Sequence, residues 1–315
     1  MASSPRDLPQ LDGSVFLMDG GLETTLTFLE GVELPFFAAF PLLLDTAGRR
    51  RLESYFEPFI RTALERKVGF VLDTPTWRSN TDWGAKLEYS VEQLVDVNRR
   101  AIAWAMDLRD KFASPTTRIV VNGVVGPRGD GYRVDAKMTA AEAHAYHNPQ
   151  IEAFQVAGAE MVSAITMNYV EEAIGIVTAA RANNIPAVIS FTVEMDGKLA
   201  SGDTLEAAIE AVERATAGAP AYYMVNCAHP SHFDKVLSGS ASWTNRVRGL
   251  RANASTKSHA ELDAATELDA GNPQELGQQY HALRRRLPQL SVLGGCCGTD
   301  HRHIAAICNA CLSSQ

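Results

Sequence analysis

The sequence predicts a single α/β domain with the (β/α)8 arrangement of a TIM barrel. Eight short apolar segments, several of them continuous and β-branched, alternate with longer segments of helical spacing along the 315 residues. Strands buried on both faces have this continuous apolar character. One α/β barrel commonly takes a chain of this length, and no Pro/Gly-rich linker divides it. A doubly wound open sheet is the alternative that this alternation permits, but eight strands favour the barrel.

Eight segments are expected to form the strands: residues 15–19, 70–74, 118–123, 161–166, 187–192, 222–227, 247–252 and 291–295. We expect residues 1–315 to form one domain, with residues 1–12 as a flexible N-terminal segment. The polar segment 256–272 is too long for an ordinary turn, which suggests a loop excursion near the active site.

Capping residues place the helices between the strands. Ser90 with Gln93 and Thr139 with Glu142 have capping-box spacing and predict helices over residues 94–112 and from 139 to about 157. Asp300 is an expected N-cap for the last helix. Apolar residues at helical spacing predict the others: 170–181, 205–216, 272–287 and 301–311.

Charge and composition narrow the class of protein. The formal net charge of −8 argues against nucleic acid or an anionic membrane as the main partner. No segment approaches the roughly 18 consecutive apolar residues of a membrane span, and the N-terminus lacks a signal pattern. Five cysteines in a chain of this length do not form a secreted disulfide framework, so we expect a reducing, cytoplasmic setting. A homo-oligomer remains possible.

Three cysteines follow two of the expected strands. Cys227 ends the sixth, and Cys296 and Cys297 follow the eighth between glycines. In a barrel these strand ends face one mouth, so three sulfurs could hold one zinc ion with a fourth position open, as in catalytic zinc sites. The alternative is three buried free cysteines. Cys308 and Cys311 lie in a helical pattern and are expected to pack.

A second cluster lies at the end of the first strand. Asp19, Gly20 and Gly21 are followed by Glu23 and Thr24, and the glycines would let backbone N–H groups approach a small anionic group. The alternative is an ordinary βα turn with Asp19 as a helix cap.

These motifs resemble those of the homocysteine S-methyltransferases. The resemblance runs through Asp19-Gly20-Gly21, Gly126-Pro127, Val225-Asn226-Cys227-Ala228 and Gly294-Gly295-Cys296-Cys297-Gly298-Thr299, with weaker echoes at Thr74-Pro75-Thr76-Trp77 and Asn253. The motifs span nearly the whole chain in the family's order, and the last two are the most specific. The family is a zinc-dependent barrel.

The resemblance implies a set of site residues. Cys227, Cys296 and Cys297 would be zinc ligands and the catalytic centre. Residues expected near the substrate are Asp19, Gly20, Gly21, Glu23, Thr24 and Asn226. One departure stands out, because family members carry a glutamate at the end of strand four where this chain has Thr166-Met167-Asn168. Glu23 could supply the missing charge.

The predicted activity is zinc-dependent transfer of a methyl group from an onium donor to the thiolate of homocysteine, which gives methionine. S-methylmethionine and S-adenosylmethionine are the preferred donors, and Trp77, Trp83 and Tyr89 either face such a cation or are core and rim residues. The missing strand-four acid leaves open a different small thiol or selenol as acceptor. A zinc-binding barrel that has lost catalysis is the alternative from another class. A redox role for the adjacent cysteines is disfavoured, because such pairs close a strained ring.

Overall fold

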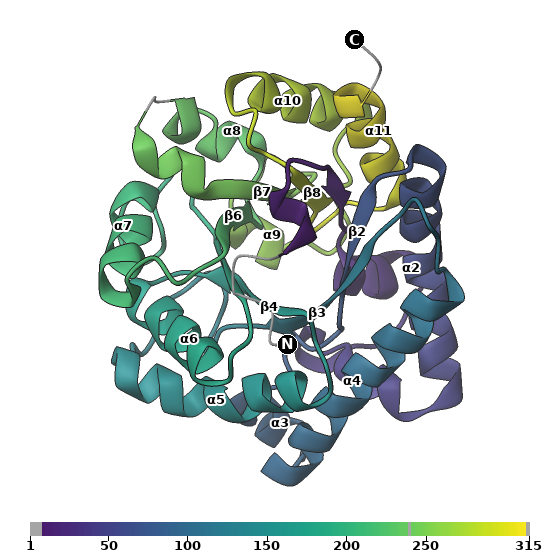
Figure 1. Cartoon of the computed structure of the whole chain (residues 1–315), viewed down its shortest axis with the longest axis vertical. Coiled ribbons are helices and arrows are strands. Elements are labelled where there is room, and N and C mark those ends of the chain that lie inside the picture. Colours follow the sequence, from purple (N-terminus) through teal and green to yellow (C-terminus); the bar gives the residue numbers. More distant parts are fainter. Residues whose placement is uncertain (1–7, 239–240, 313–315) are drawn as a thin grey trace.

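The computed structural model describes residues 8–238 and 241–312. Eight parallel strands run in order from β1 to β8, and β1 pairs with β8 to close a barrel (Figure 1). The predicted barrel is therefore confirmed and the open sheet is wrong. All eight expected strands are present: β1 Phe16–Leu17, β2 Gly69–Asp73, β3 Ile119–Val125, β4 Met161–Met167, β5 Ala187–Phe191, β6 Tyr222–Asn226, β7 Val247–Ala252 and β8 Val292–Gly295.

Helices surround the barrel (Figure 1). Within the described residues, none of them is both long enough and apolar enough to cross a membrane. Their bounds are α1 Leu22–Thr24, α2 Thr46–Arg66, α3 Thr81–Lys86, α4 Val91–Lys111, α5 Ala140–Val156, α6 Val170–Ala182, α7 Leu205–Thr216, α8 Pro230–Phe233, α9 His259–Asp263, α10 Pro273–Arg286 and α11 His301–Leu312.

The predicted helix starts are confirmed where a cap marked them. Both side-chain and backbone hydrogen bonds of the capping box form at Ser90 and at Thr139. Asp300 accepts a hydrogen bond from the Arg302 N–H in the first turn of α11, at 2.9 Å. The sequence analysis did not identify α2, which contains Pro58 in its interior. Proline ordinarily breaks a helix, yet α2 continues through Pro58 and α5 through Pro149.

The barrel interior is closed at the N-terminal ends of the strands. Leu8 packs there in an apolar cluster with Phe16, Tyr222 and Val292. Gln10 is fully buried and donates to the Tyr222 hydroxyl at 3.3 Å. Residues 1–7 of the expected flexible segment lie outside the described residues, whereas the part that follows is packed. The opposite end of the barrel, where the strands finish, holds the site.

Candidate active site

A cavity of about 420 Å³ opens at the C-terminal ends of the strands. Side chains from many βα loops line it, as is general for this fold. They include cysteines, acids and aromatic rings: Asp19, Glu23, Asp73, Asp130, Asp263, Glu267, Asp269, Cys227, Cys296, Cys297, Phe28, Phe36, Phe37, Phe56, Trp77, Trp83 and Tyr132. The expected excursion after β7 contributes Leu262, Asp263, Ala265, Glu267, Leu268 and Asp269 to this wall.

The three predicted cysteines come together at one end of this cavity. The Sγ atoms of Cys227, Cys296 and Cys297 all lie within 4.8 Å of one another. Glycines make the turn after β8 possible, since a Cβ on Gly298, whose φ is +79°, would lie 2.6 Å from the Asp269 carbonyl oxygen. Cys227 itself has a left-handed φ of 53°. Such backbone strain at a non-glycine residue concentrates at functional sites.

The three thiols compete for a single negative charge. Hydrogen bonds from Cys296 and Cys297 hold the pKa of Cys227 well below its usual range. Hydrogen bonding to Cys227 raises the pKa of Cys296 to about 12. Hydrogen bonding to Cys227 also raises the pKa of Cys297 well above the ordinary thiol value. Three thiolates at this point therefore need a cation between them. Sulfur ligands in this number suit zinc, so the residues fit the predicted metal.

Two hydroxyl groups that sequence reasoning missed contact the cysteines. The Tyr132 hydroxyl lies 3.7 Å from Cys297 Sγ, and Thr166 donates to Cys227 Sγ at 3.8 Å. The ring of Tyr132 stacks on His259 of α9 at a centroid distance of 4.0 Å. His259 is in turn 2.9 Å from Glu194. The segment after β7 thus holds the tyrosine over the sulfurs.

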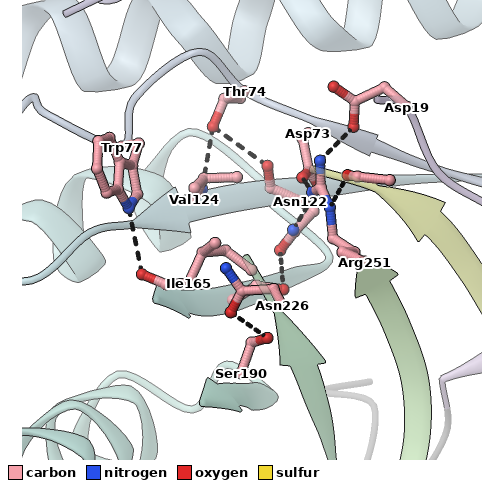
Figure 2. A network of polar contacts seen from close by, with 12 residues as sticks. Asp19, Asp73, Thr74, Trp77, Asn122, Val124, Ile165, Ser190, Asn226 and Arg251 are labelled. Carbon is pink, nitrogen blue, oxygen red and sulfur yellow. Dashed lines mark hydrogen bonds and ion pairs between the residues drawn. The ribbon is translucent and has the colours of Figure 1, made fainter. Parts of the chain in front are cut away.

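Asn226 does not line the cavity but holds one of its walls. Its side chain is fully buried, and its Oδ1 accepts from Ser190 at 2.6 Å (Figure 2) and from the Thr166 N–H at 3.0 Å. Its Nδ2 donates to the Thr166 hydroxyl at 2.8 Å. Thr166 has a φ of 67°, which is unfavourable for a β-branched residue. The contacts of Asn226 therefore fix Thr166 in the strained conformation that aims its hydroxyl at Cys227.

Asp19 is part of a buried ion network that the sequence did not reveal. Arg251 on β7 donates to Asp19 at 2.8 Å and also to Asp73 on β2 (Figure 2). Tyr55 donates to the second oxygen of Asp19 at 3.0 Å, and Asn122 donates to Asp73 at 2.7 Å. Burial raises the pKa of Asp19 to about 7, and the charge of Asp73 adds to this while Arg251 opposes it. Both oxygens of Asp19 thus already have partners within the protein.

The expected glycine pair makes close contacts with the turn that carries the cysteines. A Cβ on Gly20 would lie 2.6 Å from the Thr299 carbonyl oxygen, and one on Gly21 would lie 2.6 Å from the Cys296 carbonyl oxygen. Thr24 accepts a hydrogen bond from the Gly298 N–H at 3.2 Å. These residues border the cavity and also pack the loop after β1 against the turn that carries Cys296 and Cys297.

Glu23 faces the cavity beside the cysteines. Burial raises its pKa to about 7, and the charges of Cys296 and Asp19 add to the shift. It therefore changes charge near neutral pH. The end of β4 carries Thr166, Met167 and Asn168 in place of an acid, and the first acid after it is Glu171 in α6. Asn168 donates to the carbonyl oxygen of Asp130 in the loop after β3, at 3.0 Å.

The expected aromatic residues take different places. Tyr89 packs edge-on against Phe40 at a centroid distance of 5.2 Å and does not line the cavity. Trp83 has two cations near its ring, Arg78 and Lys86, each 3.8 Å from the centroid. The ring of Trp83 therefore already contacts two cations of the protein.

Polar contacts support the start of the last helix. His303 lies 3.1 Å from Asp300 and 2.8 Å from the Ala270 carbonyl oxygen. Cys308 is fully buried in the layer between helices and sheet. Among the residues the structure describes, the cluster of potential metal ligands is the three-cysteine group and includes neither of these side chains.

Comparison with known proteins agrees with this arrangement. The sequence model of the family described as homocysteine S-methyltransferase matches residues 16–311. Among solved structures, the oxidized form of the homocysteine methyltransferase MmuM from Escherichia coli has 20% identity and a TM-score of 0.74, over 97% of this chain and 99% of that one. Its metallated form has 19% identity and a TM-score of 0.72, over 96% of each chain. At these identities the structural likeness shows the fold. No curated protein sequence matches significantly.

Proposed function

Because the chain belongs to the homocysteine S-methyltransferase family and is a methyltransferase, we propose a specific reaction for it. It moves a methyl group from an onium donor to the thiolate of homocysteine with the help of zinc. The observation that carries the proposal is the group of three cysteine sulfurs within 4.8 Å of one another in the cavity. Cys227, Cys296 and Cys297 would hold the metal. A zinc ion bound there would keep a substrate thiol as a nucleophilic thiolate at neutral pH.

The surrounding residues would prepare this reaction by positioning. Tyr132 and Thr166 each place a hydroxyl within hydrogen-bonding reach of a cysteine sulfur, which limits where those sulfurs can move. In the transfer, the acceptor sulfur forms a bond to the methyl carbon as the bond from that carbon to the onium atom breaks. The bonding electrons leave with the donor, which becomes neutral. Alignment of the two substrates is the main contribution of such a site.

The acidic wall of the cavity favours a positively charged donor. Seven acids and two arginines line it, and Arg251 is already paired with Asp19 and Asp73. Aromatic faces attract onium groups. Because Trp83 already contacts two cations of the protein, and Lys86 also lies over the ring of Phe36, we propose that Phe28 and Phe37 at the rim, each partly exposed, serve this purpose. S-methylmethionine and S-adenosylmethionine are the donors to test.

A different small thiol or selenol is the second candidate acceptor. It is favoured by the end of β4, where Thr166 replaces an acid that would bind an amino group. Glu23 is the neighbouring acid that could take this role, since it lines the cavity. A cytoplasmic location, where free thiols stay reduced, fits either acceptor.

The decisive experiment measures zinc content and homocysteine-dependent methyl transfer in the same protein and in Cys297→Ser. About one zinc per chain, lost together with activity in the variant and after chelation, is the expected result. Cys308→Ser is the matched control, because this cysteine is buried away from the cluster. Protein kept reduced that contains no zinc would contradict the proposal. Tight zinc binding without turnover of homocysteine would instead support the other thiol.

A further inference from the structure

Arg78 is a buried arginine that has no acidic partner among the described residues. It is only 7% exposed and lies in the loop between β2 and α3, on the wall of the cavity. The other buried arginine of the described residues, Arg251, is ion-paired with two aspartates. No carboxylate in the part of the chain that the structure describes forms an ion pair with Arg78. Burying a charge without a counter-ion costs several kcal/mol, so the exception calls for a partner from outside the chain.

Two tryptophan rings hold the Arg78 side chain flat. Its guanidinium carbon lies 3.8 Å from the ring centroid of Trp77 and 3.8 Å from that of Trp83. Both indoles are fixed in turn, since Trp77 donates to the Ile165 carbonyl oxygen at 3.2 Å and Trp83 donates to that of Gly129 at 3.3 Å. We refer to Trp77, Arg78 and Trp83 as the arginine clamp. Its geometry is set before any substrate arrives.

One edge of the guanidinium in the arginine clamp is unused. Nη1 donates to the Gly129 carbonyl oxygen at 3.0 Å. Nε is buried and has no hydrogen-bond partner among the described residues. Stacking satisfies the faces of a guanidinium but not its N–H groups, and a buried donor without an acceptor costs free energy. The Nε edge has the fork shape that binds a carboxylate through two parallel hydrogen bonds.

Two acids near the clamp supply the opposite charge. Asp130 and Glu23 both act electrostatically on Arg78 and both line the cavity. Neither is ion-paired with it, and all three side chains line the same cavity, so a ligand in that cavity can face both kinds of charge. A group with a carboxylate and an ammonium on neighbouring atoms would be bound by both charges at once. The Asp19 and Arg251 network offers no such place, because its charges are already paired with one another.

We infer that the arginine clamp binds the carboxylate of an amino-acid substrate, with Glu23 and Asp130 facing its ammonium group. This inference rests on the proposed function and adds to it the residue that would recognise the carboxylate shared by its amino-acid substrates. Either the thiol acceptor or the onium donor could bring this headgroup. The carboxylate of either one would complete the hydrogen bonds of Nε and would neutralise the buried charge.

The test compares substrates with and without the carboxylate in wild type and Arg78→Gln. The acceptor pair is homocysteine and 3-aminopropane-1-thiol, and the donor pair is S-methylmethionine and its decarboxylated sulfonium. The variant should lower kcat/KM on the order of 100-fold for the member that bears the recognised carboxylate, and leave its decarboxylated partner unchanged. A lower kcat/KM for homocysteine assigns the clamp to the acceptor, and a lower kcat/KM for S-methylmethionine assigns it to the donor.

Arg128→Gln is the matched control. Arg128 lies in the neighbouring loop, pairs with Asp82 at 2.8 Å at the surface and does not line the cavity, so its loss should change none of these constants. Arg78→Lys keeps the charge without the planar fork and should fall between wild type and Arg78→Gln. If Arg78→Gln does not fold, as judged by its thermal melt, the lysine variant makes the same comparison.

Binding is also followed by tryptophan fluorescence, because Trp77 and Trp83 contact the guanidinium. This readout separates the two proposals. Wild type that binds homocysteine or S-methylmethionine more tightly than the decarboxylated analogue, but transfers no methyl group, would overturn the proposed function and support the clamp. Equal effects of Arg78→Gln on both members of each pair, or no effect on any, would overturn the clamp.

Discussion

Replacing Arg251 with methionine should strongly destabilise the protein. The guanidinium is the shared partner of Asp19 and Asp73, and all three side chains are at least 90% buried. Removing one partner from a buried ion pair costs about 3–5 kcal/mol, because the remaining charge is left without compensation. Here two carboxylates lose the same cation. We therefore expect a loss near the upper end of that range in the free energy of unfolding, measured by urea denaturation at about pH 8.5.

The pH dependence of this loss tests its cause. Burial raises the pKa of Asp19 to about 7, above the value of an unfolded aspartate, and Arg251 opposes the rise. A carboxyl group whose pKa is raised on folding contributes stability at low pH and loses it as the pH increases through the folded-state pKa. Without Arg251 that pKa rises further. The loss in free energy of unfolding of Arg251→Met relative to wild type should therefore be smallest near pH 6, where Asp19 is mostly protonated in both proteins. This loss should increase above pH 7.

An exposed arginine provides the comparison. Arg100 pairs with Asp96 at 2.7 Å on α4, and both side chains are more than half exposed. Such surface pairs contribute about 0.3–0.5 kcal/mol, so Arg100→Met should lose no more than this at either pH. A deficit for Arg251→Met as small as that of Arg100→Met at pH 8.5, or one that does not change with pH, would refute the argument.

Three further predictions concern the cavity. Asn226→Ala removes the hydrogen bonds that hold Thr166, so urea denaturation should show a loss of about 2–3 kcal/mol, and zinc affinity by competition with a chelator should fall. Gly21→Ala should reduce the zinc content, because the added Cβ would press on the turn that carries the cysteines. Gly129→Ala should not, because no atom lies within 4 Å of a Cβ added there. Equal zinc content in the two variants would contradict this reasoning. We expect Glu23 to bind the ammonium group of the acceptor, so the homocysteine KM of the wild type should rise as the pH decreases below about 7 and Glu23 becomes protonated. In Glu23→Gln the KM should not change with pH, and at pH 8 it should be about tenfold above that of the wild type.

The sequence was sufficient for the barrel and for the cysteine cluster because both depend on short-range patterns. An apolar run followed by a cysteine identifies a strand end, and closing eight parallel strands brings all such ends to one mouth. Cys227 and Cys296 thus meet although they are distant in the chain. Only the closed topology was needed, and no knowledge of how strands align was required.

The ion network could not be predicted in this way. Arg251 is the next-to-last residue of β7 and Asp73 is the last residue of β2, and these two strands are not neighbours in the barrel. Their contact depends on strand tilt and on which side chains point inward, neither of which a periodic pattern specifies. The role of Asn226 is similar, because its motif suggests a substrate contact whereas its bonds run to Thr166 and Ser190.

The two buried arginines together explain how an acidic cavity can still bind an anion. Arg251 is neutralised by aspartates of the protein, so it stabilises the wall but attracts no ligand. Arg78 is held by aromatic faces, which stabilise a cation without cancelling its charge. Trp83, for which the sequence left open a substrate cation or a core and rim position, contacts a cation that belongs to the protein. An aromatic residue near the mouth of a barrel therefore predicts a cationic ligand only when no arginine or lysine of the chain already occupies its faces.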